Sequence, residues 1–164
     1  MTAQRLANLL RRAPWLIHIP LRLARPFHAH VTVGAVGAVF NAAGQLLLVE
    51  HLFHPLTPWG LPGGGMNRGE TPDQTVRREL LEETALQIEI VRPLIITKSH
   101  LLPHHLDIGY LCRLSAPDQP IRLSRELLAY RWFSPEEPLP PLSPFHAEVV
   151  RLARQAMAAS PIFD

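Results

Sequence analysis

The sequence has a single cysteine, no long apolar run and no repeated segment. Cys112 is the one cysteine among 164 residues, which excludes a disulfide within the chain. It lies in an apolar run, as is typical of a small core residue. A cytoplasmic location is expected, because structural disulfides belong to oxidising compartments. No apolar stretch approaches the ~18–20 residues of a membrane span, and 47% hydrophobic with 18% charged residues indicates a globular domain.

Acidic residues are absent before Glu50, so residues 1–30 form a basic arm. Five of the 16 Lys and Arg residues lie in this arm, and the 14 Asp and Glu residues outnumber the remaining ones. The basic charge therefore belongs to the arm and does not indicate a nucleic-acid groove across the rest of the chain. No stable nucleic-acid partner is expected.

Short apolar patterns, interrupted by Pro14 and Pro20, predict a helical arm over residues 1–30 and a separate domain over residues 31–164. The favoured interpretation is that the arm packs onto this domain or onto a second copy in a homodimer. Contact with a membrane surface is the less favoured alternative. A signal peptide fits poorly, because the apolar stretch is short and broken.

The most informative stretch runs from residue 59 to residue 86, where three glycines at 63–65 precede an acidic helix. Thr71 suits the helix N-cap, Pro72 the first helical position, and Gln74 the reciprocal position of a capping box. Glycine allows positive φ and close backbone approach. The loop can therefore bring a main-chain carbonyl up to the helix.

Glu79, Glu82 and Glu83 are spaced i, i+3, i+4 and share one face of this helix. Like charges at these spacings repel each other, and a divalent cation relieves that repulsion. Carboxylate and carbonyl oxygens are the ligands that Mg²⁺ prefers. A solvated acidic face is the alternative, but the preceding glycines favour a site for phosphate and metal.

The stretch of residues 59–86 resembles a sequence motif, called the box, of the Nudix hydrolases, the MutT-like pyrophosphohydrolases. The matching residues, in register, are Gly64, Glu70, Arg78, Glu79, Leu80, Glu82, Glu83 and Leu86. One fixed position differs, because Ala85 stands where the family has glycine. Glycine near a helix end commonly adopts the left-handed conformation, so alanine is expected to cost on the order of 1 kcal/mol or to shift the cap. The likeness extends over roughly residues 31–159.

The resemblance implies a role for each matching residue. Glu79, Glu82 and Glu83 would be Mg²⁺ ligands, with Mn²⁺ as a possible substitute and the carbonyl of Gly63 as a companion. Arg78 would orient a helix glutamate. Glu70 would be an auxiliary ligand acting through water.

The general base is left open between a box glutamate and an acid from a later loop. Glu126 is the best later candidate, because it precedes the short strand predicted at residues 131–133, and Asp107 is the next. Each also has an ordinary reading as surface charge. Substrate contacts are expected outside the box, at Phe53, His54, Trp59, His100 and Asp107.

The flanking segments predict an α+β arrangement with a mixed sheet in α/β/α layers. Strands are expected at 31–39, 45–50, 107–114 and 131–133, one or two strands at 87–97, a turn or short helix at 124–130, and a last helix capped by Ser143. The resemblance makes residues 31–164 a Nudix hydrolase domain, with its box forming a loop–helix–loop between the layers.

Two functions follow from the resemblance. The first is Mg²⁺-dependent hydrolysis of the pyrophosphate bond in a nucleoside diphosphate linked to another moiety, such as a nucleotide, a sugar or ADP-ribose. The second is a catalytically inactive module that binds nucleotides or regulates. Inactive modules usually lose a glutamate from the acidic helix, and here Glu79, Glu82 and Glu83 are all present. The sequence therefore favours the enzyme.

Overall fold

A computed structural model describes residues 4, 10–13, 15, 31–117 and 119–159. The chain divides into two units, residues 1–30 and 31–164. The prediction of a helical arm falls almost wholly outside the described residues and stays a prediction. The elements of the second unit are β1 (Thr32–Phe40), β2 (Leu46–His51), β3 (Trp59–Gly60), β4 (Gly63–Gly65), α3 (Pro72–Thr84), β5 (Ile88–Lys98), β6 (His105–Leu114), β7 (Leu127–Phe133) and α4 (Pro144–Ala159).

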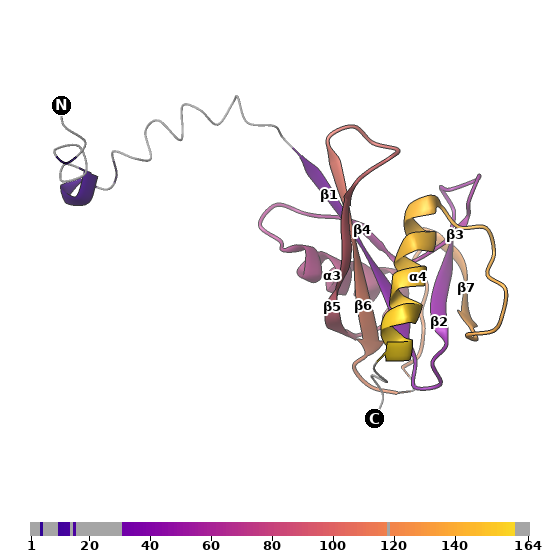
Figure 1. The fold of residues 1–164 in the computed structure, drawn as a ribbon. Coiled ribbons are helices and arrows are strands. Elements are labelled where there is room, and N and C mark those ends of the chain that lie inside the picture. Colours follow the sequence, from indigo (N-terminus) through magenta and orange to yellow (C-terminus); the bar gives the residue numbers. More distant parts are fainter. Residues whose placement is uncertain (1–3, 5–9, 14, 16–30, 118, 160–164) are drawn as a thin grey trace. The chain divides into compact units, whose positions relative to one another are not determined.

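Seven strands of the described part of the chain form one mixed sheet (Figure 1). Its main path runs β3-β2-β1-β6-β5, with β4 paired to β1 and β7 paired to β2. The central pair, β1 and β6, is parallel from Thr32 opposite His105 to Phe40 opposite Arg113. The other pairs are antiparallel. Among the described residues, no helix has the length and apolar character needed to cross a membrane.

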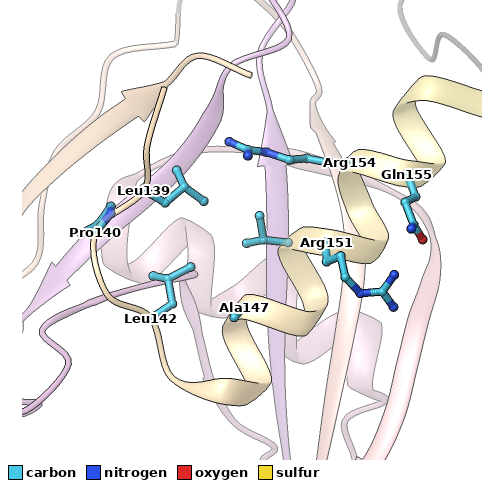
Figure 2. A pocket seen from close by; sticks show the side chains of 8 residues that line it. Leu139, Pro140, Leu142, Ala147, Arg151, Arg154 and Gln155 are labelled. Carbon is cyan, nitrogen blue, oxygen red and sulfur yellow. The ribbon is translucent and has the colours of Figure 1, made fainter. Parts of the chain in front are cut away.

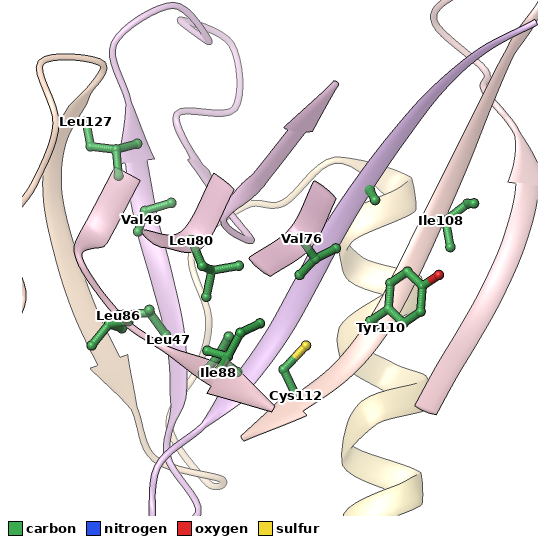
Figure 3. Packing of buried hydrophobic residues seen from close by; sticks show 12 residues of the cluster. Leu47, Val49, Val76, Leu80, Leu86, Ile88, Ile108, Tyr110, Cys112 and Leu127 are labelled. Carbon is green, nitrogen blue, oxygen red and sulfur yellow. The ribbon is translucent and has the colours of Figure 1, made fainter. Parts of the chain in front are cut away.

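The two helices cover opposite faces of this sheet, each over its own hydrophobic cluster. Val76 and Leu80 of α3 pack with Cys112 and other apolar side chains on one face (Figure 3). Val149 and Ala153 of α4 pack on the other face. This arrangement confirms the predicted α/β/α sandwich with a mixed sheet. The thiol of Cys112 is buried, and burial raises its pKa to about 12, which suits the predicted core role.

Helix α3 begins where its sequence predicts. Thr71 is the N-cap in an extended conformation, Pro72 follows it, and the backbone N–H of Thr71 donates to Gln74 Oε1 over 2.9 Å, which completes the capping box. Helix α4 begins after Ser143, whose hydroxyl accepts from the N–H of His146 at 3.3 Å. Local signals therefore set both helix starts.

Two segments differ from the expectation, and a third decides between two alternatives. Gly63–Gly65 forms strand β4 beside β1, because glycines allow this close backbone pairing. The turn or helix expected at 124–130 is wrong from Leu127 onward, where β7 begins and pairs with β2. Of the one or two strands expected at 87–97, the structure has one: β5 runs through Pro93, since it lies at the end of the sheet path and its register shifts around this proline.

Ala85 ends α3 in the left-handed conformation, with φ 62° and ψ 12°, and its N–H donates to the carbonyl of Leu81. The family glycine is thus replaced without a shift of the cap, at the cost of strain. Replacing Ala85 with glycine is expected to raise the free energy of unfolding by about 1 kcal/mol, because glycine adopts this φ without a Cβ clash. Urea unfolding measures the change. An unchanged urea midpoint would show that the backbone of Ala85 is not strained.

Candidate metal and phosphate site

Gly63 connects the glycine-rich segment to both β1 and the acidic helix. Its φ is +147°, a region reserved for glycine, and a Cβ at this position would lie 2.7 Å from Val36 Cα and collide with the carbonyl oxygen of Ala35. Its backbone N–H donates to Glu83 Oε2 at 3.1 Å. The segment therefore packs closely against β1 on one side and is hydrogen-bonded to α3 on the other.

Gly64 leaves room for the carboxylate of Glu79. A Cβ on this glycine would lie 2.5 Å from both Cδ and Oε1 of Glu79. Any larger residue would displace this carboxylate. Glycine at this position therefore lets the Glu79 carboxylate pack directly on the loop backbone.

Glu83 is the most buried of the three box glutamates, with 7% of its surface exposed. Burial raises its pKa to about 7, the hydrogen bond from the Gly63 N–H opposes this rise, and the charges of Glu79, Glu126 and Glu82 add to it. A cation at this position would relieve both the burial of charge and the repulsion.

Arg78 gathers the carboxylates on the outer side of α3. Its Nε lies 2.6 Å from Glu70 Oε1, and its Nη1 lies 2.8 Å from Glu79 Oε1 and 3.1 Å from Glu82 Oε2. Its Nη2 donates to the carbonyl of Gly65 at 3.0 Å. These acidic partners raise the pKa of Arg78 above its ordinary value. One guanidinium thus links the β4 backbone to the helix face.

Glu70 is held chiefly by Arg78, whose hydrogen bond is the largest cause lowering its pKa to about 2. The N–H of Asn67 and the hydroxyl of Thr75 also donate to this carboxylate, at 2.9 and 3.1 Å. The sequence predicted an auxiliary metal ligand at this position. The observed contacts place Glu70 against Arg78, and its role as an auxiliary ligand stays a prediction.

The donor set of this region fits a hard divalent cation, because Glu79, Glu82, Glu83 and the loop carbonyls all offer oxygen. Within the described residues, no three His, Cys, Asp or Glu side chains already converge on a point that could hold an ion. Arg78 accounts for this, since it holds Glu79 and the 60%-exposed Glu82 against its own nitrogen. Arg78 contacts one oxygen of each carboxylate, Glu79 Oε1 and Glu82 Oε2, so the second oxygen of each can still bind a cation.

Glu126 lies on the segment before β7, close enough for its charge to raise the pKa of Glu83. The backbone fixes this segment, because the carbonyl of Glu126 accepts from Leu52 N–H at 2.9 Å and Ser124 N–H donates to the carbonyl of Glu83 at 2.9 Å. The carboxylate itself is exposed. The fold therefore brings the favoured later acid to the acidic helix.

Asp107 is placed differently. Its Oδ1 lies 3.3 Å from His105 Nε2, and a Cβ on Gly34 would approach both side chains. A Cβ on Gly109, two residues along β6, would collide with Val149 of α4. Because alternate residues share a face, Asp107 projects from the face opposite α3. This position favours Glu126 over Asp107 as a partner of the box glutamates.

The remaining predicted substrate contacts are spread over several elements. Phe53 and His54 are exposed on the loop between β2 and β3, and His100 is exposed on the turn before β6. Trp59 is half-buried and meets the ring of Phe133 edge-on, with centroids 6.0 Å apart. Trp59 therefore contributes to the core, whereas the other three side chains are exposed, with the His54 ring against that of His51.

Sequence reasoning missed His146, which packs its ring against Gly60 and supports the glycine segment from α4. A Cβ on Gly60 would lie 2.6 Å from His146 Nδ1, and this nitrogen accepts from Leu61 N–H at 3.2 Å. Burial, followed by the charges of His51 and His54, lowers the pKa of His146 to about 4. These partners lie 85 residues apart, and no local pattern signals such a contact.

The fold and the site together define a class: an α/β/α sandwich in which a glycine-rich strand packs against an acidic helix. The NUDIX domain family matches residues 28–153 of this chain. The chain belongs to this family.

Named relatives agree with this assignment. An RNA pyrophosphohydrolase of Pseudomonas fluorescens is 33% identical over 138 residues, which cover 72% of this chain and 86% of the relative. Nucleoside diphosphate-linked moiety X motif 6 of Xenopus laevis is 32% identical over 128 residues, covering 75% of this chain but 58% of that protein. The crystal structure of an ADP-ribose pyrophosphatase from Streptococcus suis matches with a TM-score of 0.65 at 27% identity, covering 82% of this chain and 97% of that one.

Proposed function

We propose that this protein hydrolyses the pyrophosphate bond of a nucleoside diphosphate linked to another moiety, with Mg²⁺ as the cofactor and Mn²⁺ as a substitute. Family membership supports the class of reaction. The observation that carries the proposal is the packing of Glu79 and Glu83 directly against Gly64 and Gly63. No such packing is needed for a merely solvated acidic face.

The residues that would hold the metal are Glu79, Glu82, Glu83 and the carbonyl of Gly63. When bound, the metal supplies charge neutralisation for the diphosphate and lowers the pKa of a bound water. Arg78 orients Glu79 and Glu82 through the contacts described above, and Glu70 holds Arg78 in turn. Glu126 accepts the proton of the attacking water, which its exposed carboxylate can reach from the β7 side of the site.

The substrate is proposed to contact Phe53, His54 and His100, with Trp59 at the base of the loop and Asp107 on the neighbouring strand. Relatives named RNA pyrophosphohydrolase and ADP-ribose pyrophosphatase suggest which substrates to test first. The test is a screen of ADP-ribose, nucleotide sugars, dinucleoside polyphosphates and a 5′-triphosphorylated RNA with Mg²⁺ or Mn²⁺, in which a coupled phosphatase releases phosphate from the monoester products. Binding of these compounds without any turnover would favour the inactive module instead.

Residues 1–30 are proposed to pack onto the domain or to join two copies, in a cytoplasmic protein, rather than to contact a membrane. This proposal rests on the apolar pattern of the arm and on its five arginines. Light scattering and thermal unfolding of the protein without these residues test it. Unchanged mass and unchanged melting temperature would leave vesicle binding as the alternative.

Replacing Glu126 with glutamine is expected to lower turnover by ~10²–10⁴-fold, the usual contribution of a general base. The affinity for Mg²⁺, measured by titration calorimetry, should change little. Glu136→Gln is the matched control, since it removes an exposed carboxylate between β7 and α4 that has no assigned role in the site. A loss of less than about threefold in Glu126→Gln would return the role of base to the box helix.

A further inference from the structure

A second concave site lies on α4, on the face of the sheet opposite the box helix (Figure 2). Leu139 and Leu142 of the proline-rich segment form one wall, and Ala147, Val150 and Arg154 of α4 belong to the other. The groove has a volume of about 480 Å³, within the range of small-molecule sites. It contains none of the residues assigned to hydrolysis.

The walls of this groove are continuous with the hydrophobic core. Val150 is buried, and Leu139 and Leu142 pack against the same cluster as the inner face of α4. The free energy falls when an apolar ligand displaces water from such a surface. The groove therefore suits an apolar body.

Two arginines line the groove, and they differ in their partners. Arg151 donates to both oxygens of Glu148, at 2.8 and 2.6 Å, so its charge is already balanced. Arg154 makes no ion pair among the described residues, and its Nε and Nη2 are buried there without an acceptor. Figure 2 shows its side chain extending from α4 toward the segment of Leu139, while Arg151 points in another direction.

Buried N–H groups without an acceptor are rare and costly, and those of a charged guanidinium more so. An acceptor is therefore missing beside Arg154. Arg154 lines the groove, so its guanidinium can meet an anion that enters there. A carboxylate or a phosphate matches the fork of the guanidinium.

We propose that the groove between α4 and residues 139–142 binds a small amphipathic anion, with its apolar body on Leu139, Leu142 and Val150 and its anionic group on Arg154. The charge comes from Arg154 alone, because Glu148 balances Arg151. This site is separate from the box helix, so it stands or falls independently of the proposed hydrolysis.

The test titrates the whole protein with decanoate, decyl phosphate and decanol, which share one chain and differ in head group. Both anions should bind saturably in calorimetry. The anion that binds more tightly shows whether the site prefers a carboxylate or a phosphate. Arg154→Gln should weaken anion binding by at least about tenfold. Arg151→Gln, the matched control, should change it by less than about threefold. Decanol should bind weakly and equally to all three proteins.

The side-chain Nε–H resonance of Arg154, observed by NMR in the unmodified protein, should shift on addition of either anion, which keeps the test independent of how Arg154→Gln folds. An unmoved resonance, the lack of saturable binding, or equal affinity in Arg154→Gln would overturn the proposal. Deleting residues 160–164, which include Asp164, should leave decanoate affinity within about threefold. A large gain would make that segment the occupant and also overturn the proposal.

Discussion

Replacing Glu83 with glutamine should remove nearly all hydrolysis and leave the protein folded. Neutralisation of phosphate charge by a bound metal is worth several kcal/mol of barrier, so we expect a loss of at least about 10³-fold in kcat/KM. Glutamine keeps an oxygen that accepts from the Gly63 N–H and removes a charge whose burial raises the pKa of Glu83 to about 7. The folded state should therefore tolerate the change.

The same substitution has a predicted effect on stability. A carboxyl with an ordinary pKa of 4.5 and a folded pKa of about 7 binds more protons in the folded state between these values, so its contribution to stability falls as pH rises through this window. Glu83→Gln should lack this fall and be at least as stable as the wild type at pH 8. Thermal unfolding from pH 4 to pH 8 measures the difference.

The effect of Mg²⁺ on the melting temperature tests whether Glu83 is a metal ligand. Millimolar Mg²⁺ should raise the melting temperature of the wild type at neutral pH by mass action, with a smaller rise near pH 5, where Glu83 is protonated. Glu83→Gln should lose most of this rise. Glu136→Gln, which alters an exposed carboxylate between β7 and α4, is the control and should behave as the wild type. A Glu83→Gln protein with wild-type turnover in Mg²⁺ would defeat the assignment.

Gly63→Ala should destabilise the fold severely. The new Cβ would collide with the carbonyl of Ala35 and lie 2.7 Å from Val36 Cα, at a φ of +147° that alanine does not adopt. Both partners are backbone atoms of the central strand and cannot move aside. We expect the free energy of unfolding to fall by about 3–5 kcal/mol, a large part of the stability of a typical domain.

Gly65→Ala is the matched control, because it lies on the same short strand and a Cβ there would meet no atom within 4 Å. Its free energy of unfolding should change by less than about 1 kcal/mol. Urea unfolding of the two variants side by side separates the steric effect from the general loss of a glycine. Equal midpoints would show that β4 can move away from β1, contrary to the close packing observed.

The parts of the fold that sequence predicts well are those set by neighbouring residues. Thr71, Pro72 and Gln74 determine where α3 begins, and the spacing of Glu79, Glu82 and Glu83 determines which side chains share a face. The i, i+3, i+4 rule needs no knowledge of the rest of the chain. The helix of the site was predictable for this reason.

The parts that sequence reasoning missed depend on distant contacts. Strand β4 exists because glycines pair with β1, and the support of Gly60 by His146 joins residues far apart in sequence. Leu127 begins a strand because β2 offers it a partner, although its neighbours suggest a turn. The sequence predicts only part of the contacts of Arg78, because its hydrogen bond to the carbonyl of Gly65 forms only when the loop folds back onto the helix.

The parallel pairing of β1 with β6 has a consequence for how the chain is made. Thr32 and His105 are 73 positions apart, and the box and its helix are synthesised between them. At ~5–20 residues per second, one edge of β1 waits about 4–15 s on the ribosome before its partner emerges. Strand β4 can pair with the other edge meanwhile, so the acidic helix forms against a half-built sheet. Until β6 emerges, this edge of β1 has unpaired backbone groups that could pair with another chain.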